Sequence, residues 1–312
     1  MNRFFRILLR FSLCPVIVFA ALCVVTRIYF YYTFRDAVAA SQNVSTVILG
    51  DSHPQKALIA DSIDQSFNFS FSSERHANDY KKLGILSEKD SLRLVIVGVS
   101  YHSFASSHEQ HTPAYCYKYC FTFYPFIREM PYRCYWELSD RATMIEVILC
   151  HELGFLSRNS LPMMKQELMG IPLLYSHSEQ IAPLPVDWAS KIAAHYYEGY
   201  DADVLRTPDF SFIEALCDIQ SFCRERDCKL VLFNAPVSSG YYAHIPPFYK
   251  HLTDSVVNAL VDNRTTFYFD YTRYPLPDSC YADGDHLNRY GADIITPLLR
   301  DSLRSLGLLD RL

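Results

Sequence analysis

Five short segments carry the hydrophobic patterns of β-strands. Three of them are continuous apolar runs followed by polar turns: Thr46–Gly50, Arg93–Val99 and Lys229–Phe233. Runs of this length without alternation are typical of strands that are buried on both faces of a parallel sheet. Two further segments, Phe67–Phe71 and Thr266–Asp270, alternate more between apolar and polar positions and predict weaker strands.

The segments between these strands repeat their apolar residues at helical spacing. Helices are predicted over Glu74–Leu86, Asp209–Arg226 and His244–Val261, and a last helix begins near Arg289. Strands that alternate with helices favour a parallel sheet that helices cover on both faces. We therefore predict an α/β protein, with a three-layer α/β/α domain and a mostly parallel five-stranded sheet over residues 44–308.

A long segment, residues 101–207, separates the third predicted strand from the fourth. It is too long for a simple crossover and predicts a large insertion, which forms a lid or a subdomain. Its first part, residues 101–136, holds 12 aromatic residues. These rings either line a binding surface for glycan or acyl chains or pack on the sheet, and the sequence leaves both interpretations open.

The N-terminal pattern predicts a membrane anchor over residues 1–36. Sixteen uncharged, mostly apolar residues lie between Arg10 and Arg27, and the aromatic segment Ile28–Phe34 extends them toward a membrane interface. Residues 1–35 contain five Arg and no acidic residue. By the positive-inside rule the N-terminus is cytoplasmic, and the rest of the chain is extracytoplasmic after a single transmembrane helix.

A cleaved signal peptide is the alternative interpretation of this segment. The nearest cleavage-like site, Ala37–Ala39, lies too far beyond the apolar run for that interpretation. An uncleaved signal anchor is therefore favoured, and membrane attachment through the N-terminal helix is expected.

Composition excludes several classes of protein. The 312 residues are 50% hydrophobic and 20% charged, with a formal net charge of -5, which excludes a disordered chain. The acidic balance argues against nucleic acid as a partner. The sequence has no Walker loop and no dinucleotide fingerprint, and we expect no cofactor and no metal. Its ten cysteines are compatible with disulfides outside the cytoplasm and equally with buried thiols.

Two distant motifs carry the candidate chemistry. Ser52 follows the first predicted strand in Gly50-Asp51-Ser52, and ligands of open α/β sheets bind beyond the carboxyl ends of strands. Asp283 and His286 stand in a D-x-x-H pattern just before the last predicted helix. A serine hydroxyl is a weak nucleophile that needs a base, and a carboxylate three residues from a histidine is able to orient its ring.

Together, the G-D-S motif and the late D-x-x-H motif resemble those of the SGNH (GDSL-type) hydrolase superfamily. The resemblance implies an SGNH or flavodoxin-like domain over residues 44–308. It also implies that Ser52 is the nucleophile, that His286 is the general base and that Asp283 orients the imidazole.

The chain departs from this family in the expected oxyanion hole. The backbone N–H of Ser52 is one expected donor, but Asn68–Ser73 lacks the family's Gly and Gly98–His102 lacks its Asn. Each lost donor costs roughly 3–4 kcal/mol of transition-state stabilisation. The substitutes in these two segments are hydroxyl and imidazole side chains, namely Ser72, Ser100 and His102.

Other interpretations of these residue types are weaker. Ser52 is also suited to cap a helix. Ser100 lies in G-V-S-Y-H, one residue away from a nucleophile elbow, but the elbow requires a small residue in place of His102. The segment from His108 to Cys120 holds two His and two Cys, without the spacing of a structural zinc site.

The expected function is that of a membrane-anchored serine esterase or O-acyltransferase. Its substrate is expected to be an acyl ester of a cell-envelope glycan or a similar extracytoplasmic molecule. The alternative is a catalytically degenerate SGNH-fold envelope protein, which binds glycan or partners a multispanning membrane acyltransferase. Ser52, Asp283 and His286 favour the enzyme, whereas the missing Gly and Asn favour the alternative.

Overall fold

A computed structural model of the chain describes the core of the predicted α/β domain and parts of the N-terminal segment. The chain divides into two compact units, one of which joins Ala37–His111 to Leu174–Leu312, while the other joins Met1–Asp36 to Thr112–Leu173. The structure describes most of residues 11–25, a few residues between 28 and 41, and then residues 44–72, 74, 76–86, 92–105, 187–197 and 210–309. Most of the predicted insertion therefore lies outside the described residues.

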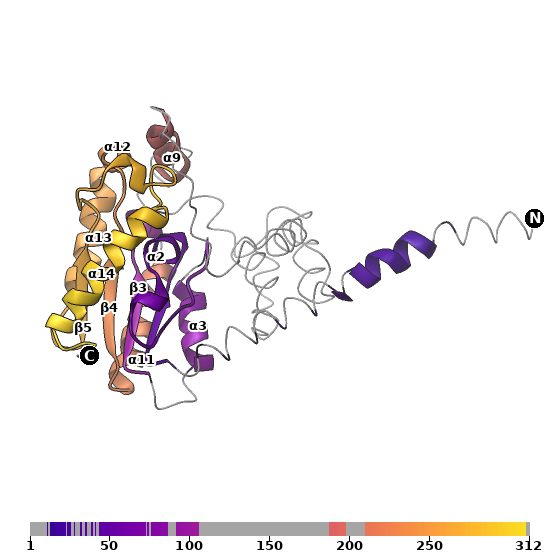
Figure 1. Cartoon of the computed structure of the whole chain (residues 1–312), viewed down its shortest axis with the longest axis horizontal. Helices are drawn as coiled ribbons and strands as arrows, with labels where there is room; N and C mark the ends of the chain where they lie inside the picture. Colours follow the sequence, from indigo (N-terminus) through magenta and orange to yellow (C-terminus); the bar gives the residue numbers. More distant parts are fainter. Residues whose placement is uncertain are drawn as a thin grey trace, which may run out of the picture. The chain divides into compact units, whose positions relative to one another are not determined.

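The sheet has five strands, and all of them are parallel (Figure 1). Their order is β2-β1-β3-β4-β5. The α/β class and the five predicted strands are confirmed, and the sheet is wholly rather than mostly parallel. The strands are β1 (Thr46–Leu49), β2 (Ser66–Asn68), β3 (Leu94–Gly98), β4 (Lys229–Asn234) and β5 (Thr266–Asp270).

Helices connect the strands. In the described part of the α/β unit, the α-helices are α2 (Ser52–Ala57), α3 (His76–Leu86), α9 (Trp188–Tyr197), α11 (Phe210–Glu225), α12 (Ser239–His244), α13 (Pro247–Leu260) and α14 (Arg289–Ser305). Short 3-10 helices are η1 (Ala60–Ser62), η2 (Tyr101–Phe104) and η3 (Asp278–Cys280).

One predicted helix, His244–Val261, is wrong at its start. His244 ends α12, and α13 begins three residues later at Pro247. Pro246 and Pro247 cause the break, because proline has no backbone N–H to donate within a helix and is tolerated only in its first turn.

The strand order explains how the helices cover the sheet. Crossovers between parallel strands are right-handed, and the order reverses at β1, so α2 lies on one face and α3, α11 and α13 on the other. α14 returns to the face of α2, where Leu299 packs in one buried cluster with Ile48, Ile96 and Val231 of the strands. The order reverses between β1 and β3, and ligands of open α/β sheets usually bind beyond the carboxyl ends of the strands at such a point.

A close contact of two glycines with Pro54 shapes this edge. Gly50 ends β1 with φ +124°, a conformation that side chains rarely adopt, and a Cβ there would lie 2.8 Å from Cγ of Pro54. A Cβ on Gly98, at the end of β3, would also collide with Pro54. Both glycines are therefore needed for α2 to begin directly above the strand ends.

The predicted transmembrane helix is not found. Among the residues that the structure describes, no helix combines the length and the apolar character needed to cross a bilayer. The uncharged run of the predicted anchor, residues 11–26, is shorter than the roughly 20 apolar residues of a spanning helix. Several residues of the predicted anchor, 1–36, lie outside the described part of the chain.

The described cysteines are free thiols. Cys223 and Cys228 are buried, and the thiol of Cys228 donates a hydrogen bond to the carbonyl of Leu92 over 3.1 Å. Burial raises the pKa of both thiols. Five further cysteines lie outside the described residues, namely Cys23, Cys116, Cys120, Cys134 and Cys150.

Asp262 gives a test of the fold that is independent of function. Its carboxylate accepts hydrogen bonds from the hydroxyl of Thr265 and from the backbone N–H groups of Thr266, Thr265 and Arg264, and these bonds lower its pKa. A depressed pKa contributes stability above the unfolded value near pH 4, and this contribution is lost as pH falls below it. Asp262→Ala should lower the unfolding free energy by about 1 kcal/mol at pH 7, and the difference should shrink below pH 4.

Urea denaturation at pH 7 and pH 3 measures this difference. Asp254→Ala, at an exposed position of α13, is the control and should be neutral at both values. A destabilisation by Asp262→Ala that is the same at both pH values would contradict the assignment.

Candidate active site

The turn after β1 places Ser52 at the carboxyl edge of the sheet. Asp51 caps α2, because its Oδ1 accepts a hydrogen bond from the backbone N–H of His53 over 2.8 Å. The buried N–H of Gly50 donates to Oδ1 of Asp79 in α3 over 3.0 Å. Ser52 is the first residue of α2, so its backbone N–H has no acceptor within that helix.

A second buried carboxylate network supports this turn from α3. Oδ2 of Asp79 lies 2.9 Å from Nδ1 of His76, which fixes the carboxylate that holds Gly50. One turn further along α3, the wholly buried Lys82 forms an ion pair with Glu74. The turn that presents Ser52 is therefore held by Asp79, which His76 fixes in place.

The loop before α14 presents His286. Tyr281 and Leu287 pair as an antiparallel bridge and close the loop. Within it, Oδ1 of Asp283 accepts hydrogen bonds from the backbone N–H groups of Asp285 and His286 over 3.1 and 2.8 Å. Asp283 therefore folds its own turn, as Asx residues do, and directs the His286 ring.

Two further contacts tie this loop to the domain. Asn288 caps α14 by accepting from the N–H of Gly291 over 3.1 Å, and its side-chain amide donates to the carbonyl of Ser279 over 2.7 Å. The backbone N–H of Ser238, after β4, donates to the carbonyl of Gly284 over 3.0 Å. Hydrogen bonds on both sides thus hold the loop.

The three predicted catalytic residues lie in one hydrogen-bonded row. Nε2 of His286 lies 2.7 Å from Oγ of Ser52, although the two residues are 234 positions apart in the chain. On the other side of the ring, Nδ1 lies 3.0 Å from each carboxylate oxygen of Asp283. These distances are within the reach that proton transfer between a hydroxyl, an imidazole and an orienting carboxylate requires.

Asp285 is a second carboxylate at the same imidazole. Its Oδ1 lies 3.1 Å from Nδ1 of His286, and its side chain is 1% exposed, compared with 25% for Asp283. Burial by itself disfavours the charged imidazole, but Asp285 and Asp283 outweigh it and raise the pKa of His286 to about 10. The same attraction overcomes burial and holds the pKa of Asp285 well below its ordinary value.

The predicted oxyanion donors have different surroundings. Ser72 donates its hydroxyl to Oε1 of Gln55 in α2 over 2.8 Å. Ser100 precedes η2, and its backbone N–H donates to Oγ of Ser103, whereas its buried hydroxyl has no hydrogen-bond partner among the described residues. Nε2 of His102 lies 3.0 Å from Oδ2 of Asp51. His102 therefore contacts Asp51, the residue directly before the predicted nucleophile Ser52.

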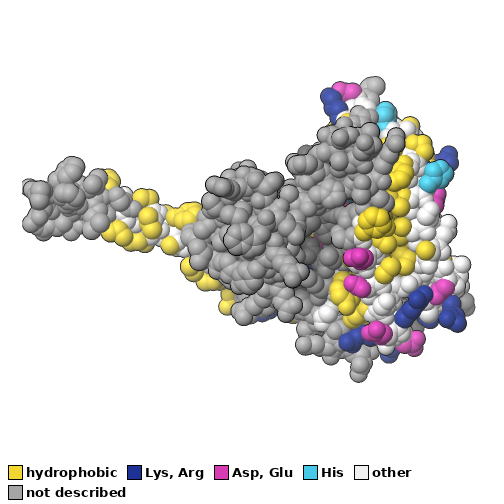
Figure 2. All heavy atoms as spheres, turned by 180° about the vertical axis from the view of Figure 1, so that it is seen from behind, with side chains coloured by type: hydrophobic (Ala, Val, Ile, Leu, Met, Phe, Trp, Pro, Cys, Tyr) yellow, Lys and Arg dark blue, Asp and Glu magenta, His cyan; other side chains and the backbone are white. Residues whose placement is uncertain are grey.

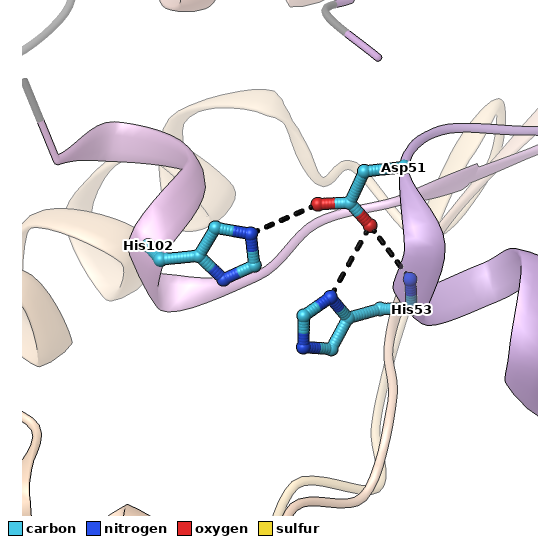
Figure 3. A group of neighbouring side chains, drawn as sticks. All are labelled: Asp51, His53 and His102. Atoms are coloured by element: carbon cyan, nitrogen blue, oxygen red, sulfur yellow. Dashed lines mark hydrogen bonds and ion pairs between the residues drawn. The ribbon is translucent and has the colours of Figure 1, made fainter. Parts of the chain in front are cut away.

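Sequence reasoning missed a cluster of histidines around Asp51 (Figure 3). Nδ1 of His53 lies 3.3 Å from Oδ1 of Asp51, and His102 lies at the other oxygen. The His53 ring also lies between the rings of His102 and His286, at centroid distances of 4.6 and 4.7 Å. The signal was the His directly after G-D-S.

These groups shift the pKa values of the cluster. Burial opposes the charge on Asp51, but His53 and His102 outweigh it and hold the pKa of this carboxyl well below its ordinary value. For His102, burial exceeds the attraction of Asp51 and lowers the pKa of the imidazole. Asp51 is therefore charged and His102 is neutral near pH 7.

The described helix of the predicted insertion, α9, borders this cluster. The Tyr196 ring stacks on His102 with centroids 4.4 Å apart and an interplanar angle of 23°. Tyr197 packs against Tyr241 and Tyr249 in a buried aromatic cluster. Of the predicted aromatic-rich part, residues 101–136, only 101–105 are described, and the His108–Cys120 segment lies outside the described residues.

Comparisons with known proteins do not assign the chain to a family. No protein-family model matches it, and a search of curated proteins finds no significant match. Inference about function therefore depends on the geometry of this site.

Replacing Asp79 should loosen the turn that presents Ser52. Asp79→Ala leaves the buried N–H of Gly50 without its acceptor, which costs about 1–3 kcal/mol of unfolding free energy. Asp79→Asn keeps an amide oxygen at the same place and should cost less. Urea denaturation of the two variants measures the difference, and equal stability of Asp79→Ala and the unchanged protein would contradict this role.

Replacing Asp285 should lower the pKa of His286. Asp285→Asn removes one of the two carboxylates at Nδ1, and the pKa should fall by about one to three units. Titration of the imidazole C–H signals by NMR measures the shift. Asp293→Asn, which removes an exposed carboxylate from α14, is the matched control and should leave the pKa of His286 unchanged.

Proposed function

We propose that the protein is an SGNH-like serine esterase or O-acyltransferase. The observation that carries the proposal is the row of Ser52, His286 and Asp283, with 2.7 Å between the hydroxyl and Nε2 and 3.0 Å between Nδ1 and the carboxylate. The positions of these residues beyond the carboxyl ends of parallel strands support it further, since open α/β sheets bind their ligands there.

In the proposed reaction, Oγ of Ser52 attacks the carbonyl carbon of an acyl ester, and its proton passes to Nε2 of the neutral form of His286. Because the pKa of His286 is raised to about 10, this form is the minor one at pH 7 and its share grows with pH. The ester C–O bond then breaks, and His286 returns the proton to the departing alkoxide, leaving an acyl group on Ser52. Water or a sugar hydroxyl takes the acyl group in the second half-reaction, with His286 again moving the proton. Asp283 keeps Nδ1 protonated and stabilises the imidazolium that forms.

The proposed substrate is an acyl ester of a cell-envelope glycan or a similar extracytoplasmic molecule, with the protein held at a membrane by its N-terminal segment. Residues 13–22 are helical, and apolar side chains such as Val16, Ile17 and Phe19 are exposed there (Figure 2). Exposed apolar surface of this kind favours contact with lipid or with another protein. The five Arg of residues 1–35 favour an N-terminus on the cytoplasmic side.

A second candidate is an SGNH-like envelope protein without catalysis, which binds glycan or partners a multispanning acyltransferase. One observation favours it, because the hydroxyl of Ser72 and the imidazole of His102 are bonded to neighbouring side chains. If neither the Ser72 hydroxyl nor the His102 imidazole donates to the substrate, the oxyanion of the tetrahedral intermediate is only weakly stabilised. Binding alone, however, does not require a serine, a histidine and a carboxylate in a hydrogen-bonded row.

The decisive experiment uses the full-length chain purified in detergent, with p-nitrophenyl acetate as acyl donor. Ser52→Ala should lower the rate of acetyl release by about 10³-fold or more, because the nucleophile is lost. Ser305→Ala, at an exposed hydroxyl of α14, is the matched control and should retain the full rate. A fluorophosphonate probe should label Ser52 in the unchanged protein, which mass spectrometry of peptides detects.

The outcomes separate the candidates. Equal rates for Ser52→Ala and the unchanged protein would refute Ser52 as nucleophile. Neither turnover nor labelling in the unchanged protein would favour the non-catalytic candidate. Acetyl transfer to an added oligosaccharide, in preference to release into water, would identify an acyltransferase.

A further inference from the structure

A second group of polar side chains adjoins the nucleophile and has no part in the proposed reaction (Figure 3). It consists of Asp51, His53 and His102, which α2 and η2 bring together from the ends of β1 and β3. One ligand atom from each residue lies within 4.8 Å of the other two. All three side chains are largely buried.

His53 is the unexplained member of this group. Its side chain is 2% exposed, yet neither ring nitrogen has a hydrogen-bond partner among the described residues. Nδ1 faces Oδ1 of Asp51 at 3.3 Å, and Nε2 faces Oδ2 of Asp285 at 3.6 Å. A buried polar group without a hydrogen-bond partner is unfavourable, and a further ligand at His53 would remove this cost.

We propose that Asp51, His53 and His102 bind a divalent first-row transition-metal ion, for which Zn²⁺ is the best match. The ligands are the Asp51 carboxylate, Nδ1 of His53 and Nε2 of His102. Two imidazoles and one carboxylate are a usual donor set for such ions, and bonds of about 2.0–2.2 Å in a tetrahedron place ligand atoms roughly 3.3 Å apart. The Asp51 carboxylate faces both rings, with Oδ1 at 3.3 Å from Nδ1 of His53 and Oδ2 at 3.0 Å from Nε2 of His102. One ligand atom from each of the three residues lies within 4.8 Å of the others.

The surroundings of His53 fit the same assignment. When Nδ1 of His53 binds a metal, its Nε2 carries the proton and points at Asp285. A carboxylate at the far nitrogen of a ligating histidine is the usual second partner in metal sites, where it fixes the tautomer and the orientation of the ring. Stacking on Tyr196 restrains His102 in a comparable way.

Three protein ligands leave a fourth position of a tetrahedral ion open, as in catalytic zinc sites. Ser52 lies between Asp51 and His53 in the sequence, and its hydroxyl contacts His286, whose ring lies 4.7 Å from that of His53. If the proposed function also holds, the ion supplies positive charge near the carbonyl oxygen, where the family's Gly and Asn donors are missing. Metal binding itself does not depend on that function.

The test measures Zn²⁺ binding to the full-length chain in detergent, after treatment with EDTA, by isothermal titration calorimetry. His53→Ala and His102→Ala should each weaken one Zn²⁺ site per chain by more than about 100-fold, since loss of a ligand exceeds the 10–100-fold effect of a second partner. Asp285→Asn should weaken the same site by about 10–100-fold. His251→Ala, an exposed histidine on α13, is the matched control and should bind as the unchanged protein does.

Co²⁺ provides a second readout that reports geometry rather than affinity. Binding of Co²⁺ should give the strong visible absorption of a tetrahedral site, and His102→Ala should remove it even if His53→Ala fails to fold. Ser52→Ala should keep both the Zn²⁺ affinity and the Co²⁺ spectrum, so failure of the proposed catalysis leaves this result unaffected. Absence of Zn²⁺ binding to the unchanged protein would overturn the proposal, as would histidine variants that both bind Zn²⁺ as tightly as the unchanged protein does. His53 would then be an ionic partner of Asp51 and Asp285.

Discussion

The hydrogen bond from Gly50 to Asp79 is the constraint from which the geometry of the site follows. Gly50 adopts a φ of +124°, and its buried N–H has its acceptor in α3 rather than in the sheet. That turn allows α2 to start immediately after β1, with Pro54 packed against the end of β3 at Gly98. Ser52 is thereby fixed at the topological switch point of the sheet, before any residue from the C-terminal half takes part.

The other half of the site is the loop before α14, which hydrogen bonds within the loop hold in place. Asp283 accepts hydrogen bonds from two backbone N–H groups of the loop and also holds the ring of His286. One side chain thus fixes both the backbone and the imidazole. Asn288 couples the loop to the start of α14, so burial of that helix against the sheet sets the height of His286 above Ser52. Such preorganisation is what a proton-transfer site requires.

Much of the fold could be predicted because its signals are local. Continuous apolar runs identify β1, β3 and β4, and motifs that follow strand ends are brought to one edge by any parallel sheet, as Ser52 and His286 are. The break between α12 and α13 also had a local signal, Pro246-Pro247, that the helical spacing obscured. The cluster of Asp51, His53 and His102 had only a partial local signal, the His directly after G-D-S, because the approach of His102 depends on how η2 packs beside α2 in three dimensions. The oxyanion donors were unpredictable for the same reason.

Asp285 makes the two histidine clusters one electrostatic unit. Its Oδ1 faces Nδ1 of His286 and its Oδ2 faces Nε2 of His53, so one buried charge acts on both rings. A change in the charge or the ligands of His53 therefore alters the field at His286, and the reverse holds equally. Residues that share a partner in this way have non-additive effects when replaced. A single substitution at Asp51, His53 or Asp285 therefore affects both the His53 cluster and His286. Double-mutant cycles are needed to divide the measured effect between these two groups.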